Sequence, residues 1–259
     1  MDTILLNFSI GKFLFLSIAC FSGAFIDAIA GGGGIITVPA FILSGMPIHF
    51  ALGTNKFTSV FLCLGSALKY LRSGKVNFSI VKYTSIVAFC SSFLGVYAVS
   101  KIDDKLLEPL VMILLMLLTI YVLLNKRLGF ENTFKSLDRK TSIIGLIATF
   151  IISFYIGFFG PGGGSFLLFA YVKIYGFDFI SASANVKATA LFAAIAAVIA
   201  FIILGKVVYM YAIPLSFVMF IGGQLGAKFA LKKGAAVVRP VFILVSILTV
   251  GKMLFDKFI

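Results

Sequence analysis

Two lysines lie within otherwise apolar stretches, each in a short polar motif that occurs twice. The motifs are Thr54-Asn55-Lys56-x-Thr58 and Asn185-Val186-Lys187-x-Thr189. A lysine within a membrane span costs roughly 2.5–3.5 kcal/mol and usually faces the protein interior. Neighbouring Asn and Thr side chains supply hydrogen-bond donors suited to sulfonate or carboxylate oxygens. Alternatively, each lysine lies near enough to a helix start to reach outward to the headgroups. We take as anion-binding candidates Thr54, Asn55, Lys56, Asn185, Lys187 and Thr189.

Two glycine clusters, Gly31-Gly32-Gly33-Gly34 and Pro161-Gly162-Gly163-Gly164, each precede a short apolar run. Glycine lets a ligand approach the main chain closely. A helix that begins there offers free N–H groups and the positive end of its dipole, which suit an anion. The alternative is that small residues only permit close helix packing. Because the clusters occupy matching positions, we favour binding, with candidates Gly32, Gly33, Gly34, Gly162, Gly163 and Gly164.

Few other residues could carry chemistry. Asp27, one turn before the first cluster, is a candidate for a structural ion pair with one of the lysines or for a coupling proton, and we favour the pair. The single histidine, His49, has no Ser or Cys partner pattern. The cysteines Cys20, Cys63 and Cys90 lack metal-ligand spacing. Neither glycine cluster continues into Gly-Lys-Ser or Gly-Lys-Thr, which excludes a nucleotide phosphate loop. We therefore expect no enzyme activity, no metal and no cofactor.

The elements that position these motifs are apolar runs with short polar breaks, which predict an all-α polytopic membrane protein. With 61% hydrophobic and 12% charged residues, the chain is far from a soluble composition. About 20 apolar residues suffice for one span. The second and seventh runs are too short to span, and each begins at a glycine cluster. The predicted helices cover 5–30, 35–45, 50–71, 77–100, 106–124, 141–159, 164–175, 181–204, 207–230 and 237–256.

The two halves of the chain match each other in order. The glycine clusters and the two asparagines match at an offset of 130 (162−32 and 185−55), and the later pairs Gly74/Gly205 and Gly95/Gly226 match at 131 (205−74 and 226−95). One residue is therefore inserted near Val186. The pattern predicts a first membrane repeat over 1–124, a linker over 125–140 and a second repeat over 141–259.

The distribution of charge predicts an orientation. The net charge of +13 is better explained by basic cytoplasmic loops than by nucleic-acid binding, which we do not expect. The linker is the most basic stretch, so we place it in the cytoplasm. If the other Lys-rich loops are also cytoplasmic, the two repeats are inverted. We expect a multi-pass protein of the cell inner membrane.

The stretch Gly23 to Pro39, followed by Ala51-Leu-Gly-Thr-Asn-Lys56, resembles the signature of the TauE/SafE family, also called the sulfite exporter or toluene sulfonate uptake permease family. The segments Gly157 to Ser165 and Ser183 to Lys187 resemble its second repeat. The resemblance covers nearly the whole chain. It implies a bacterial inner-membrane protein that moves sulfur-containing anions such as sulfite, sulfoacetate or related sulfonates.

From these features we expect a secondary transporter, an exporter of small sulfur-containing or other organic anions, that works by alternating access. The rival interpretations are an anion channel, which needs a continuous pore with weak sites, and a non-transporting membrane assembly partner. The expected partners are a small anionic substrate and the lipid bilayer. Formation of a homo-oligomer is left open.

Overall fold

The structure is a computed structural model that describes residues 10–101, 132–134, 137–234 and 240. Within these ranges all regular structure is α-helical. The helices are, in chain order, α2 (Ile10–Ala30), α3 (Gly34–Leu43), α4 (Ile48–Arg72), α5 (Phe78–Val99), α7 (Arg139–Phe158), α8 (Gly163–Tyr175), α9 (Phe179–Ile203) and α10 (Tyr209–Lys233).

The helices agree with the expected ones to within a few residues. The two short runs are confirmed as short helices: α3 has 10 residues and α8 has 13, and each begins at its glycine cluster. The start of the first expected helix, the two helices expected over 106–124 and 237–256, and most of the linker lie outside the described residues.

Five of the described helices are long and apolar enough to cross a membrane: α2, α5, α7, α9 and α10. Helix α4 equals α9 in length, with 25 residues, but carries Lys56, Lys69 and Arg72. The outward faces of the bundle are rich in exposed large apolar side chains, for example Ile18 and Ile203, as a lipid-facing surface requires. The all-helical membrane class is therefore confirmed, while the full number of spans stays a prediction.

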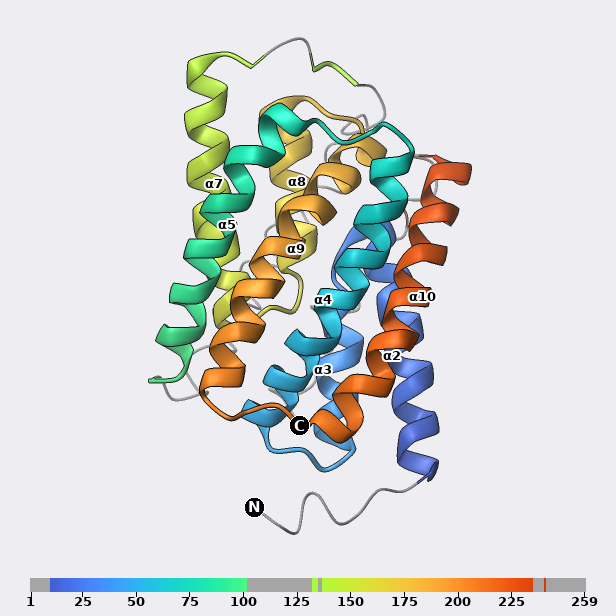
Figure 1. The fold of residues 1–259 in the computed structure, drawn as a ribbon. Coiled ribbons are helices and arrows are strands. Elements are labelled where there is room, and N and C mark those ends of the chain that lie inside the picture. The colour runs from blue at the N-terminus through green and yellow to red at the C-terminus, as the bar shows by residue number, and fades with distance from the viewer. Residues whose placement is uncertain (1–9, 102–131, 135–136, 235–239, 241–259) are drawn as a thin grey trace, which may run out of the picture.

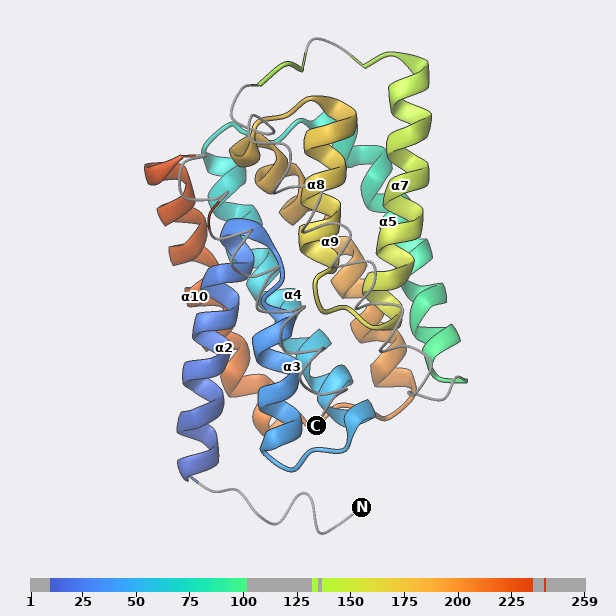
Figure 2. The same cartoon turned by 180° about the vertical axis from the view of Figure 1, so that it is seen from behind.

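The order long, short, long, long occurs twice along the chain, in α2–α5 and again in α7–α10. In Figure 1, α2 and α4 run upward while their sequence counterparts α7 and α9 run downward. Helices α5 and α10 are likewise antiparallel to each other (Figure 1). Figure 2 shows the two short helices α3 and α8 on the same side of the bundle. These directions support the predicted inverted repeats.

Matching glycines bring matching pairs of helices into close contact. Gly95 of α5 lies so near α7 that a side chain there would overlap the carbonyl oxygen of Phe154. Its sequence counterpart Gly226 of α10 lies equally near α2, against the carbonyl oxygen of Phe25. The small residues allow the backbones to approach, as is common in membrane bundles. Each contact joins one half of the chain to the other, so α5–α7 and α10–α2 are equivalent pairs.

The polar motifs also join the two halves. The hydroxyl of Thr54 on α4 accepts a hydrogen bond of 3.0 Å from the backbone N–H of Val208, which precedes α10. In the other half, the amide oxygen of Asn185 on α9 accepts one of 2.7 Å from the backbone N–H of Asn77, which precedes α5. Val208 and Asn77 correspond at the offset of 131 (208−77). Each half thus satisfies a backbone donor at the start of a helix in the other half, which matters where water is scarce.

Candidate functional site

A small cavity of about 70 Å³ lies at the centre of the bundle, between the two halves. Its lining combines polar and charged side chains with small residues from both halves. The lining residues are Asp27, Gly33, Gly34, Thr37, Asn55, Lys56, Ser59, Leu62, Cys63, Ile156, Gly160, Gly164, Lys187, Ala190, Ala194 and Met219. The cavity therefore gathers seven of the thirteen residues that the sequence analysis selected.

An ion pair between two residues that line this cavity joins one half of the chain to the other. The ammonium of Lys187 on α9 lies 2.5 Å from one carboxylate oxygen of Asp27 on α2. The other carboxylate oxygen accepts a hydrogen bond of 2.9 Å from the backbone N–H of Gly33, at the beginning of α3. Lys187 is 2% exposed and Asp27 16%. Asp27 thus occupies the positive end of a half-helix dipole and neutralises one of the two lysines.

The second lysine makes a different contact. The ammonium of Lys56, also buried, donates a hydrogen bond to the backbone carbonyl oxygen of Ile156, in the last turn of α7. Because the carbonyls of a last turn have no partner within their helix, Lys56 satisfies one of them. Beside it, the Thr37 hydroxyl donates a hydrogen bond of 2.6 Å to the side-chain oxygen of Asn55. Neither lysine extends to the headgroups, so the outward-reaching interpretation is wrong for both.

The two glycine clusters meet at the cavity. A side chain on Gly31, whose φ is +77°, would overlap the backbone of Gly164 and Ser165. Gly34 lies against Pro161, where an added Cβ would be 3.2 Å from the proline Cα. The clusters therefore serve close packing, while Gly33, Gly34 and Gly164 also line the cavity. Close packing of the clusters is thus observed, whereas anion binding by these glycines stays a prediction.

The last carbonyls of α2 end inside the bundle and are satisfied by hydroxyls. Ala28 accepts a hydrogen bond of 2.9 Å from the Tyr70 hydroxyl. The Ser183 and Ser165 hydroxyls each donate one of 3.0 Å, to the carbonyl oxygens of Ile29 and Ala30. Ser183 and Ser165 belong to the second half. An interrupted helix is tolerated at membrane depth only when such partners exist. These hydroxyl groups therefore stabilise the break in the chain between α2 and α3.

The remaining selected residues lie outside the lining of the cavity. Thr54 and Asn185 support the starts of α10 and α5, as described above. Thr189 belongs to a buried hydroxyl cluster, 2.9 Å from the Thr84 hydroxyl and 3.2 Å from that of Tyr171. Three of the selected glycines also lie outside the cavity lining: Gly32, Gly162 and Gly163. Gly32 and Gly162 adopt positive φ values of +83° and +78°, and Gly163 packs against Ile156. Their role in substrate binding stays a prediction.

The cavity also contains polar residues that the sequence analysis did not select, chiefly Thr37, Ser59 and Cys63. Ser59 and Cys63 follow Lys56 by three and seven positions on α4, which places them on the same helix face. This helical spacing from Lys56 is the sequence feature that could have predicted both residues. Among the described residues, no three His, Cys, Asp or Glu side chains are grouped closely enough to hold a metal ion.

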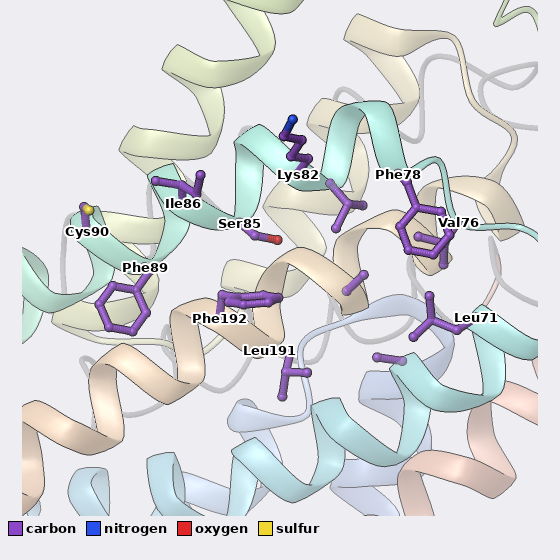
Figure 3. Close-up of a pocket in the computed structure, with 13 residues that line it drawn as sticks. Leu71, Val76, Phe78, Lys82, Ser85, Ile86, Phe89, Cys90, Leu191 and Phe192 are labelled. Carbon is purple, nitrogen blue, oxygen red and sulfur yellow. The ribbon is translucent and has the colours of Figure 1, made fainter.

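A larger hollow of about 710 Å³ lies between α4, α5 and α9 (Figure 3). Its lining is apolar, with Leu71, Phe78 and Phe192 around it, and these side chains are exposed on the outer surface. Figure 3 shows the Lys82 amine pointing away from Leu191 and Phe192. The hollow is therefore suited to apolar groups of the bilayer rather than to an anion.

The fold and the cavity define a multi-pass membrane protein with a buried polar centre between two similar halves. The sequence matches the family described as "Sulfite exporter TauE/SafE" over residues 15–253. The chain belongs to this family. It is similar to a "Probable membrane transporter protein" of Haemophilus influenzae, with 33% identity over 92% of both chains.

Two further relatives carry similar names. The "Probable membrane transporter protein ORF9" of a Sinorhizobium species is 31% identical over 93% of this chain and 92% of its own. The "Probable membrane transporter protein YfcA" of Escherichia coli K12 is 33% identical over 90% of this chain and 86% of its own. No solved structure matches this chain.

Proposed function

We propose that this chain is a secondary transporter that carries a small anion across the inner membrane, with the central cavity as its binding site. The observation that carries the proposal is the buried meeting of Lys56, Lys187 and the start of α3 in one cavity between the halves. Intramembrane charged residues that face a cavity mark substrate pathways. The names of the relatives, which are membrane transporter proteins, support the same class.

The size of the cavity favours a small substrate. A cavity needs about 10–15 Å³ to admit one water molecule, so a cavity of about 70 Å³ admits only a few atoms of that size. Sulfite and other oxyanions of similar size fit that space, whereas an aromatic sulfonate does not fit without rearrangement. Together with the description of the family as sulfite exporters, this makes sulfite our leading candidate.

The cavity also offers a place for alternating exposure. Its walls come from helices of both halves, and the charged side chains that line it are largely or fully buried. Transporters with inverted repeats bind their substrate near the midplane and expose it to each side in turn by moving one part against the other. A small site with buried charged side chains favours a transporter over a channel, which needs a continuous open pore.

The charges at the two ends of the bundle support an orientation and a direction. The end where α4 and α10 finish and α7 begins carries Arg72, Arg139, Lys140, Lys232 and Lys233. Within the described ranges, the opposite end has fewer basic residues. Basic loops favour the cytoplasm, so we place the first end there. An inside-negative potential favours export of an anion, by about 2.3 kcal/mol per charge per 100 mV.

The test is uptake of labelled sulfite into liposomes that contain the purified protein, with empty liposomes as the control. We expect saturable uptake that is accelerated by unlabelled sulfite inside the vesicles, because an alternating-access carrier exchanges its substrate. Flux that rises linearly with concentration and is unaffected by internal substrate would show a channel instead. Absence of any anion flux would contradict the proposal.

A further inference from the structure

Among the residues that the structure describes, three formally charged side chains line the central cavity, and their charges do not cancel. They are Asp27, Lys56 and Lys187. With one carboxylate and two ammonium groups, their formal charges add to one net positive charge. The other lining residues, among them the Cys63 thiol, are neutral in their ordinary forms.

The carboxylate of Asp27 forms an ion pair with only one of the two lysines. Asp27 contacts Lys187 at 2.5 Å, and its second oxygen accepts the Gly33 N–H at 2.9 Å. Both oxygens of the carboxylate are therefore engaged. Lys187 is 2% exposed, so its charge is balanced inside the protein and not by water.

Lys56 has no matching carboxylate among the described residues. The duplication places Gly157 where the first half has Asp27 (27 + 130), so the second half cannot form an equivalent pair. Of the two lysines in the cavity, Lys187 forms the ion pair with Asp27, and Lys56 donates instead to the carbonyl oxygen of Ile156.

Helix dipoles do not change this balance. The beginning of α3, with partial positive charge, meets Asp27, whereas the end of α7, with partial negative charge, meets Lys56. Each is equivalent to about half a charge, with opposite signs. Their sum is close to zero, so the formal count of one positive charge stands.

We propose that the site selects singly charged anions, with Lys56 as their counter-charge and Asp27 as the residue that discriminates against doubly charged ones. Sulfite is then carried in its singly protonated form, hydrogensulfite, and not as the dianion. This deepens the proposed transport function and rests on it. A singly charged anion neutralises the cavity. A second negative charge on the anion has no free ammonium to pair with, because Lys187 already pairs with Asp27. It is also repelled by the Asp27 carboxylate, and this repulsion is strong where little water is present.

The experiment uses two probes of nearly equal size and tetrahedral shape, methanesulfonate with one charge and sulfate with two. Competition of each with labelled sulfite uptake is measured in liposomes at one fixed pH. For the wild type we expect methanesulfonate to compete better than sulfate by at least about tenfold, because of the unpaired second charge. Equal competition, or better competition by sulfate, would overturn the proposal.

Two variants separate selectivity from folding. Asp27→Asn raises the net charge of the cavity by one and should shift the preference toward sulfate by about tenfold or more. The double variant Asp27→Asn/Lys187→Met removes the pair, keeps one positive charge on Lys56, and should again prefer methanesulfonate. If Asp27→Asn does not fold, the double variant decides: a preference for sulfate there refutes the charge count.

Failure of the underlying function has a different signature. If the wild type moves no sulfite and neither probe binds, the transport proposal falls and this inference falls with it. If sulfite uptake is intact but Asp27→Asn keeps the wild-type ratio of the two probes, transport stands and Asp27 does not set the selectivity.

Discussion

The contact between the two glycine clusters gives the sharpest prediction about the architecture. Gly31 has a φ of +77°, and a methyl group there would overlap the backbone of Gly164 and Ser165. Gly31→Ala therefore carries two costs. A left-handed conformation costs a non-glycine residue about 1–2 kcal/mol, and overpacking a tight contact costs about 1–3 kcal/mol. We expect a loss of about 2–5 kcal/mol in the free energy of unfolding.

The chain supplies a matched control for the backbone term. Gly74 has a similar φ of +71°, lies in an exposed turn after α4, and has no atom within 4 Å of the added methyl group. Gly74→Ala should lose only the backbone cost of about 1–2 kcal/mol. Gly164→Ala, whose methyl group would lie 3.2 Å from the Gly31 Cα, should be milder than Gly31→Ala.

The assay is unfolding of the purified variants by a denaturing detergent, followed by circular dichroism, together with their sulfite uptake in liposomes. The difference between Gly31→Ala and Gly74→Ala isolates the packing of the clusters. Equal losses in the free energy of unfolding for the two variants would show that the glycine clusters are not in close contact. That result would refute the packing described above for the centre of the bundle.

Two further predictions concern single hydrogen bonds. Tyr70→Phe leaves the Ala28 carbonyl without its partner and should cost about 1–3 kcal/mol in the same unfolding assay, whereas the exposed Tyr83→Phe should cost little; equal losses would argue against the bond. Hydrogen bonds from Thr141 hold the pKa of Asp138, just before α7, below its ordinary value. The stabilisation by Asp138 is therefore present above the unfolded-chain pKa of about 3.9 and is lost as the pH falls through the lowered value. The protection factor of the amide hydrogens at the start of α7, which allows for the intrinsic pH dependence of exchange, should fall on acidification in the wild type but not in Asp138→Asn. A wild-type protection factor that does not change with pH would contradict this.

The helices were predictable because their ends carry polar or glycine breaks. The short helices α3 and α8 follow directly from the glycine clusters, since glycine at positive φ ends one helix and lets the next begin. The bounds differ by a few residues because the ends of apolar runs do not fix which residue begins the helix.

The candidate site was predictable only in part, because residues of one motif face different sides of their helix. Residues two positions apart on a helix point to opposite sides, so Lys187 and Thr189 cannot both face one cavity. Thr189 instead meets Thr84 and Tyr171. The helical spacing from Lys187 to Ala190 and Ala194 does follow one face, and both of these residues line the cavity.

The choice of partners could not be derived from spacing. Lys187 and Asp27 are 160 positions apart, and a repeat pattern does not say how one half is placed against the other. The sequence suggested a pair between Asp27 and one of the lysines, and the geometry selects Lys187 because Lys56 lies at the end of α7. The two halves differ at this position, because Gly157 in the second half corresponds to Asp27 in the first. This difference is visible in the sequence only once the two halves are aligned.

The central claim is that an anion crosses the membrane through the cavity that Lys56 lines. It is tested most directly by sulfite uptake in liposomes with Lys56→Met, using Lys82→Met as the control, because Lys82 is exposed on α5 and lies outside the central cavity. We predict that Lys56→Met loses saturable uptake while Lys82→Met keeps it, with equal amounts of both proteins in the vesicles. Wild-type uptake by Lys56→Met would contradict the account.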